Sequence, residues 1–155
     1  MNEYQRNPGA SEGPSYRVLN LTRTFGRVSR APLDYLKANG CELVMPRHNP
    51  PLGEEDLIDE FRDIDAVIVG TEPITARVIN EAPRLKVISK HGVGVDNIDL
   101  IAAKERGIAV TITPGANSQA VAELTIGFIF SLARDIPRAD RSMREGKWER
   151  IVGVE

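Results

Sequence analysis

Hydrophobic residues gather in five short runs between residues 16 and 113, separated by stretches with the spacing of amphipathic helices. The runs have the length of β-strands and cover residues 16–21, 42–45, 66–70, 85–89 and 108–113. The helical stretches are expected at residues 29–39, at 54–61, in a short segment capped by Thr75, and at 99–106. Gly40 and Gly107 follow the first and the last of these helices, where a glycine is suited to end a helix.

Strict alternation of strands and helices is typical of an α/β fold with a parallel sheet and helices on both faces. Right-handed crossovers leave few topologies for five strands, and we expect a flavodoxin-like, doubly wound order. The run 66–70 contains no polar residue, which predicts a strand that is buried on both faces. Residues 16–113 are therefore predicted to form one flavodoxin-like domain. Residues 1–15, rich in glycine, proline and polar residues, are expected to be a disordered tail.

The alternation stops after residue 113. Residues 117–134 predict one long helix whose apolar side chains lie nearly all round it. A helix without a polar face has to be covered on every side, so a partner subunit or a further domain is implied. A second, more polar helix is expected from Pro137 to about Gly146. Residues 114–155 are therefore assigned to a separate second region.

The composition of the 155 residues, 41% hydrophobic and 27% charged, is that of a soluble globular protein. A net charge of −2 without any block of Lys and Arg argues against nucleic acid as a partner. The longest apolar stretch, residues 120–133, is interrupted by Glu123 and is short for a bilayer, so no membrane span is expected. The single Cys41 excludes an internal disulfide, and no secretory signal is recognised, which together favour the cytoplasm. Two distant histidines and one cysteine offer no metal-ligand spacing.

A glycine-rich segment, residues 92–97 with the sequence GVGVDN, follows the fourth predicted strand and precedes a helix. It is not a dinucleotide fingerprint, because Asn97 occupies the third glycine position and the next strand ends without an acidic residue. Asp96 and Asp99 are expected to cap the following helix themselves. The segment could still form a nest in which backbone amides of residues 93–95 bind a carboxylate, or it could be a plain turn. The residues alone favour the plain turn, since such turns are common in α/β folds.

Neighbouring residues are weaker candidates for a substrate site. Lys90 could attract an acidic substrate or be a solvated surface lysine, and His91 could serve a substrate or be a hydrogen-bonded structural histidine. A third role for His91, that of a base acting within this chain, predicts activity without NAD. Gly70, Thr71 and Glu72 follow the third strand at the same edge of the sheet, with a simple turn closed by proline as the alternative.

Two long motifs change this picture. Residues 86–99 read KVISKHGVGVDNID and residues 113–134 read TPGANSQAVAELTIGFIFSLAR, followed by GKWER at 146–150. They resemble the D-isomer-specific 2-hydroxyacid dehydrogenases, in particular the phosphoglycerate dehydrogenase branch of that family, over about residues 16–155. The resemblance implies a two-domain enzyme that uses NAD to oxidise the hydroxyl of a 2-hydroxy acid. It also implies that the helix at 117–134 begins the cofactor domain and helps to form a homodimer.

The resemblance assigns roles to the glycine segment and reverses the preference for a plain turn. By this resemblance Gly92, Val93 and Gly94 hold the substrate carboxylate, and Val93 also borders the cofactor. Residues 70–73, with Lys90 and His91, complete the expected substrate site.

Two departures from the family pattern matter. Phosphoglycerate dehydrogenases typically carry an Arg-Ser pair in the turn after the third strand, where this chain has Thr71 and Glu72. The substrate is therefore open between phosphoglycerate and another 2-hydroxy or 2-keto acid. The family's GxGxxG segment and its catalytic Arg, Glu and His match positions beyond Glu155, so we expect no catalytic residue, no bound NAD and no activity in this part alone. The alternative is a stand-alone flavodoxin-like module that binds small carboxylic acids or a protein partner.

Overall fold

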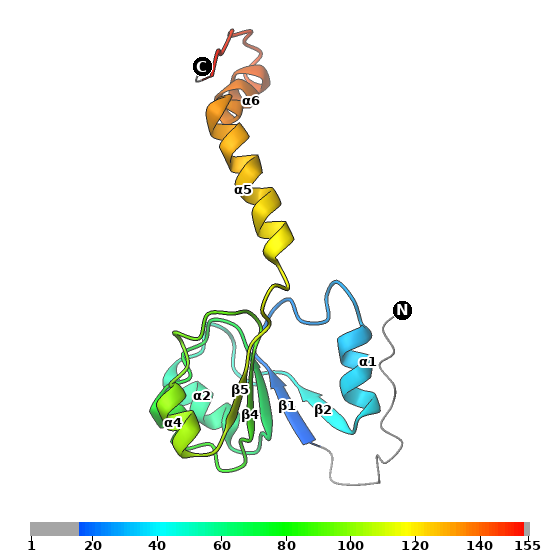
Figure 1. The fold of residues 1–155 in the computed structure, drawn as a ribbon, viewed down its shortest axis with the longest axis vertical. Coiled ribbons are helices and arrows are strands. Elements are labelled where there is room, and N and C mark those ends of the chain that lie inside the picture. Colours follow the sequence, from blue (N-terminus) through cyan, green and yellow to red (C-terminus); the bar gives the residue numbers. More distant parts are fainter. Residues whose placement is uncertain (1–15, 154–155) are drawn as a thin grey trace. The chain divides into compact units, whose positions relative to one another are not determined.

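The structure, a computed structural model, describes residues 16–153, and the expected tail lies outside the described residues. Five parallel strands form one sheet in the order β2-β1-β3-β4-β5, which confirms the flavodoxin-like topology (Figure 1). The strands are β1 (Tyr16–Asn20), β2 (Cys41–Val44), β3 (Ala66–Val69), β4 (Val87–Lys90) and β5 (Ala109–Thr111). The strand order reverses between the neighbouring strands β1 and β3. In open α/β sheets, ligands usually bind at the loops that follow the two strands at such a reversal.

Four helices connect these strands: α1 (Ala31–Ala38), α2 (Glu54–Phe61), α3 (Ala76–Asn80) and α4 (Leu100–Glu105). The side chain of Thr75 accepts a hydrogen bond from the amide of Val78, and Asp99 accepts from the amides of Ile101 and Ala102. Both residues are therefore the N-caps that the sequence predicts. The expectation that Asp96 shares this capping is wrong, since α4 begins only at Leu100 and Asp99 alone caps it.

The hydrophobic core lies on one face of the sheet, beneath α2, α3 and α4. Alternate strand residues with almost no exposed area, among them Leu19, Val67 and Ile88, point into it. They pack against helix residues such as Phe61 and Ile79, which are also fully buried. Burial of this kind stabilises the fold by about 1.5–3 kcal/mol for each large apolar side chain.

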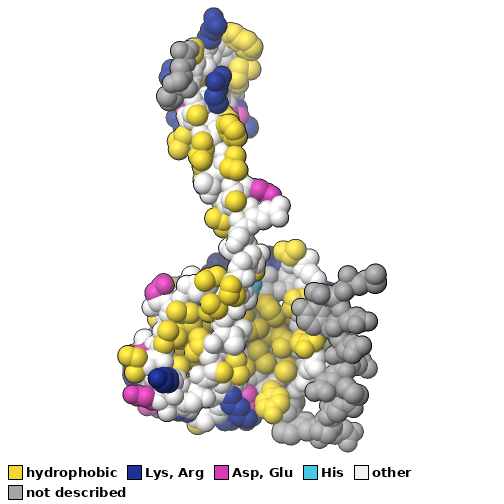
Figure 2. Space-filling model, viewed as in Figure 1, with side chains coloured by type: hydrophobic (Ala, Val, Ile, Leu, Met, Phe, Trp, Pro, Cys, Tyr) yellow, Lys and Arg dark blue, Asp and Glu magenta, His cyan; other side chains and the backbone are white. Residues whose placement is uncertain are grey.

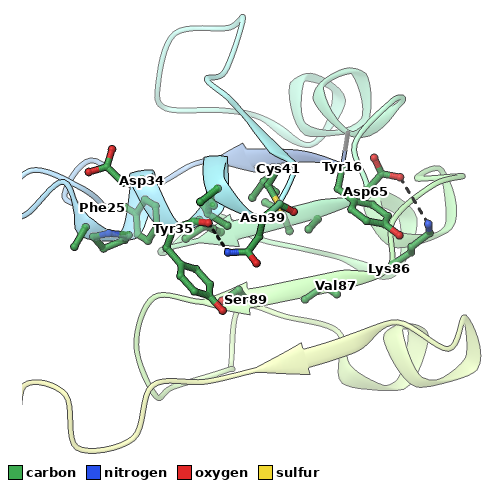
Figure 3. Close-up of a pocket in the computed structure, with 18 residues that line it drawn as sticks. Tyr16, Phe25, Asp34, Tyr35, Asn39, Cys41, Asp65, Lys86, Val87 and Ser89 are labelled. Carbon is green, nitrogen blue, oxygen red and sulfur yellow. Dashed lines mark hydrogen bonds and ion pairs between the residues drawn. The ribbon is translucent and has the colours of Figure 1, made fainter. Parts of the chain in front are cut away.

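Of the four helices that connect the strands, α1 lies over the opposite face of the sheet. A largely apolar pocket opens between that helix and the strands (Figure 3). Tyr35 comes from α1 and Asn39 follows the end of that helix, while Val87 and Ser89 come from β4. The prediction that β3 is buried on both faces holds for Val67, Ile68 and Val69, but Ala66, at the pocket, is only partly buried.

A second compact unit begins at Gly115 and is described to residue 153. It consists of α5 (Ser118–Ala133) and α6 (Ile136–Arg144), which contact each other. No residue of α5 is buried, and Figure 2 shows hydrophobic side chains along its visible face. Its exposed large apolar residues are Val121, Leu124, Ile126, Phe128, Ile129, Phe130 and Leu132. None of the helices within residues 16–153 combines the length and the hydropathy that a bilayer crossing needs.

Candidate functional site

Three loops meet at the carboxyl edge of the sheet, and each begins where a central strand ends. The loop after β4, residues 91–98, is called the glycine loop below. The amide of His91 donates to the carbonyl of Val69 at 2.9 Å, which extends the pairing of β3 and β4 by one residue. The carbonyl of Gly92 accepts from the amide of Thr113 at 2.8 Å and from its hydroxyl at 3.1 Å. These bonds hold the start of the glycine loop between its two neighbours.

The apex of the glycine loop presents unused hydrogen-bond donors. Within residues 16–153, the amides of Gly92, Val93, Gly94 and Val95 donate to no acceptor. Gly92 has φ of +155°, a conformation that L side chains rarely adopt. Val93 and Gly94 are exposed, so these amides are open to solvent and to a ligand. Consecutive free amides of this kind suit a carboxylate, which accepts several hydrogen bonds.

Lys90, the last residue of β4, is buried with 8% of its area exposed. Its Nζ donates to the carbonyl of Gly70 at 2.5 Å and to Oδ1 of Asn97 at 2.6 Å. The alternative of a solvated surface lysine is therefore wrong. No carboxylate of the described residues forms an ion pair with Lys90, so its positive charge is balanced only by neutral oxygens. A buried charge without an ionic partner is costly, and a bound anion nearby would offset that cost.

The turn after β3, residues 70–73, is held to the glycine loop from the other side. The Asn97 side-chain amide donates to the carbonyl of Glu72 at 2.7 Å and to that of Gly70 at 3.3 Å. The Glu72 carboxylate accepts from the amide of Gly70 at 3.0 Å, so it closes its own turn, and Thr71 is exposed beside it. The structure thus brings Gly70, Thr71 and Glu72 together with Lys90.

An isolated parallel bridge joins the same two loops further from the strands. The amide of Ile74 donates to the carbonyl of Asn97 at 2.8 Å, and the amide of Asp99 donates to the carbonyl of Ile74 at 2.9 Å. Ile74 is fully buried and Ile98 is 6% exposed. The far ends of both loops are therefore anchored in the core.

His91 lies at the exposed surface of the glycine loop. Its ring contacts Phe25 edge-on, with 6.3 Å between the ring centroids, and makes no hydrogen bond within the described residues. The interpretation of a hydrogen-bonded structural histidine is therefore wrong. No carboxylate of the described residues orients the ring, as the base of a catalytic pair requires. His91 thus lies at the start of the glycine loop, and the geometry gives no support for its acting as a base within this chain.

Sequence reasoning missed two contributors to the site. Asn97 stands out in the sequence only because it occupies the third position of a glycine pattern, yet its side chain ties two loops together. Phe25, in the loop after β1, gives no local signal that it reaches His91. Among the described residues no group of three or more His, Cys, Asp or Glu is placed to hold a metal ion.

Comparison with known proteins identifies the family of the chain and agrees with its fold. Residues 22–151 match the family model for the D-isomer specific 2-hydroxyacid dehydrogenase catalytic domain. A D-3-phosphoglycerate dehydrogenase of Archaeoglobus fulgidus is 42% identical over 131 residues, which cover 83% of this chain and 24% of that protein. The human D-3-phosphoglycerate dehydrogenase is 51% identical over 123 residues, covering 77% of this chain and 22% of that protein. The chain spans about a quarter of the length of these relatives.

Solved structures give the same result. The NAD+-bound 3-phosphoglycerate dehydrogenase of Entamoeba histolytica matches with a TM-score of 0.68 and 31% identity, over 77% of this chain and 40% of that one. A D-isomer specific 2-hydroxyacid dehydrogenase structure from Polaromonas matches with a TM-score of 0.79 and 28% identity, over 91% of this chain and 45% of that one. The expected family is confirmed: this chain belongs to the D-isomer specific 2-hydroxyacid dehydrogenases and resembles their phosphoglycerate dehydrogenase branch.

Proposed function

We propose that this chain is the substrate-binding part of an NAD-dependent D-2-hydroxyacid dehydrogenase of the phosphoglycerate dehydrogenase type. One observation carries the proposal: the free amides of Gly92, Val93 and Gly94 lie in the loop that follows the buried, ionically unpaired Lys90. Donors of this kind, close to a positive charge, suit the carboxylate that every 2-hydroxy acid carries.

The residues of the site would contribute to binding in different ways. The amides of the glycine loop would hold the carboxylate directly, and the Lys90 ammonium would favour the anion from beneath the loop. Asn97 and the turn 70–73 would hold the two loops together, since the Asn97 side chain and the Lys90 ammonium both donate hydrogen bonds to carbonyl groups of that turn. The hydroxyl-bearing carbon is then fixed at a constant place relative to the loop, which is the contribution of substrate positioning to catalysis.

We expect no dinucleotide site of the Rossmann kind within this chain. Asn97 replaces the third glycine of such a loop, and β5 is followed by Ile112 and Thr113 rather than by an acidic residue for a ribose. Val93, half-exposed at the apex of the glycine loop, is the one described residue to which we assign a cofactor contact. When bound, NAD would supply the hydride acceptor. We assign no catalytic residue to this chain and expect no turnover from it alone.

The apolar helix α5 supports a homodimer. Large side chains on all its sides are half or more exposed, from Ile126 at 53% to Leu132 at 76%. An exposed apolar surface of this extent marks an interface. A second copy of the chain, contributing the same helix, would cover it symmetrically.

The proposal is tested by titrating the isotope-labelled chain with D-glycerate and following backbone amide shifts by NMR. We expect shifts concentrated at Gly92, Val93 and Gly94, and none with the neutral amide of the same acid, because the carboxylate is the recognised group. An equal response to the neutral amide, or shifts confined to other loops, would contradict the proposal. A chain that oxidised the acid without any further polypeptide would contradict the expected inactivity instead.

A further inference from the structure

The loop between β1 and α1, residues 22–30, carries a concentrated positive charge. Its sequence TRTFGRVSR contains three arginines and no acidic residue. Arg23, Arg27 and Arg30 are exposed, and none of the three forms an ion pair within residues 16–153. Most other arginines of the sheet domain are paired, as Arg47, Arg77 and Arg84 are with Asp or Glu. The charge of this loop is therefore available to an external anion.

The loop has a defined shape. Oδ1 of Asn20, the last residue of β1, accepts from the amide of Thr22 at 3.0 Å and from its hydroxyl at 2.9 Å. The Thr22 hydroxyl oxygen accepts in turn from the amide of Phe25 at 3.3 Å. Gly26 has φ of +76°, and a Cβ there would lie 2.8 Å from the side chain of Leu33 in α1. The loop is thus folded onto the end of its strand and against the following helix.

Two contacts place this loop beside the carboxylate site. A methyl carbon of Thr22 lies 3.7 Å from the position that a Cβ of Gly70 would occupy. The Phe25 ring meets the His91 ring of the glycine loop edge-on. β1 and β3 are also the two strands between which the sheet order reverses, where ligands of open α/β sheets bind. Arg23 follows the first contact residue directly, and Arg27 is two residues beyond the second.

The turn after β3 does not provide this charge. Residues 70–73 contain no arginine, and the carboxylate of Glu72 is bonded within the turn. A substrate with an anionic group remote from its carboxylate needs a cation elsewhere at the same edge. Arginine suits such a group because its planar fork pairs two donors with the oxygens of a phosphate.

We propose that Arg23 and Arg27 bind a second anionic group of the substrate, a phosphate on the carbon chain of the 2-hydroxy acid. This inference rests on the proposed function and extends it, since it assigns the recognition of a phosphorylated acid to the loop after β1. The glycine loop and Lys90 hold one end of the acid, and the arginines of residues 22–30 hold the other.

The test compares two acids that differ only in the phosphate, D-3-phosphoglycerate and D-glycerate. Each is titrated by NMR into the unaltered chain, into Arg23→Gln, into Arg27→Gln and into the double variant. Arg62→Gln is the matched control, because the substitution removes the same charge from a highly exposed arginine that lies after α2, away from the loop 22–30. We expect phosphoglycerate to bind the unaltered chain more tightly, and each loop substitution to weaken it about tenfold, the effect of one lost charge-assisted contact. Glycerate binding should change less than about twofold, as for exposed charges without direct contact.

Three results are distinguishable. If both acids shift the glycine loop and only the loop variants remove the preference for the phosphorylated acid, the inference stands. If both acids bind the glycine loop with equal affinity, or the preference survives in the double variant, Arg23 and Arg27 have no such role, while the proposed function holds. If neither acid shifts Gly92 to Gly94, the proposed function fails and the inference fails with it. Unchanged amide shifts outside residues 22–30 in each variant would show that the fold is intact.

Discussion

The ammonium of Lys90 and the side-chain oxygen of Asn97 lie 2.6 Å apart, beneath the apex of the glycine loop. A Cβ at Gly92 would sit 3.6 Å from Cε of the same lysine, so the lysine stem also supports the loop backbone. The two residues are seven positions apart in sequence and enclose the loop between them. This pairing lies at the base of the proposed carboxylate site, and its role in binding can be tested without the cofactor.

Lys90→Met keeps most of the stem and removes the charge. We expect carboxylate binding to weaken about tenfold and the free energy of unfolding to fall by about 1–2 kcal/mol, because Oδ1 of Asn97 loses a charged donor. Glycerate titration and urea unfolding measure the two effects. Lys104→Met on the exposed surface of α4 removes the same charge and should leave both unchanged. Binding that is intact in Lys90→Met would show that the amides act without the lysine.

Gly94→Val tests the apex of the loop itself. A Cβ at Gly94 would lie 3.3 Å from the carboxylate of Asp96, so that side chain or the loop backbone has to move. We expect glycerate affinity to fall by about tenfold or more, as for the loss of a hydrogen bond to a charged group. Gly53→Val, before α2, is the control, because its Cβ would make only an ordinary contact at 3.5 Å. Equal affinity in the two variants would count against the amide site.

Glu60 gives the domain a pH-dependent stability. Burial raises the pKa of this carboxyl, but hydrogen bonds from the backbone and ring of His48 and from Arg47 outweigh burial and lower the pKa below its usual value. Its Oε1 accepts from the His48 amide at 2.9 Å and from the ring nitrogen Nδ1 at 2.8 Å. A lowered pKa means that the stabilisation is complete above the unfolded-state pKa and is lost as the pH falls through the folded-state pKa.

We therefore expect Glu60→Gln to lower the free energy of unfolding by about 2–3 kcal/mol above pH ~5, with the difference from the unaltered chain narrowing below pH ~4. Urea unfolding between these pH values measures it. Glu105→Gln at the exposed end of α4 should show no comparable difference. If the difference in the free energy of unfolding between Glu60→Gln and the unaltered chain stays constant down to acid pH, the substitution acts through packing and not through charge.

Dimerisation through α5 is tested by charge placed on opposite faces of the helix. Phe128 and Phe130 are both 60% exposed and lie roughly 200° apart around the axis. We expect the unaltered chain to sediment as a dimer and the double variant Phe128→Glu, Phe130→Glu to sediment as a monomer. Ser118→Glu adds charge at the polar start of the same helix and should remain dimeric. If the unaltered chain sediments as a monomer, the proposed dimer is contradicted and the alternative of a stand-alone binding module is favoured.

Local signals were enough to predict most elements of the fold. The limits of α2 agree residue for residue with the prediction, because its first turn is acidic and its apolar residues recur on one face. Thr75 and Asp99 were identifiable as caps for the same reason, since a cap needs only its own helix. β2 runs from Cys41 to Val44, one residue earlier than predicted, because pairing with β1 places Cys41 opposite Tyr16.

The candidate site was predictable in its residues but not in its contacts. The free amides follow from glycines at a strand end, which sequence can show. The burial of Lys90 cannot be read locally, since it depends on a carbonyl twenty positions earlier in the chain. The ring contact of His91 likewise cannot be read locally, since its partner Phe25 lies in the loop after β1.

The bridge between Ile74 and Ile98 has a consequence for how the site opens to solvent. The amides of Ile74 and Asp99 lie outside the strands, yet both are hydrogen-bonded within the core. Their exchange with deuterium should require the same cooperative unfolding as that of the central strands, whereas the amides of Val93 and Gly94 should exchange at once. Within the glycine loop, fast exchange would then be confined to the apex, and binding of an acid there would be seen as slower exchange of those amides.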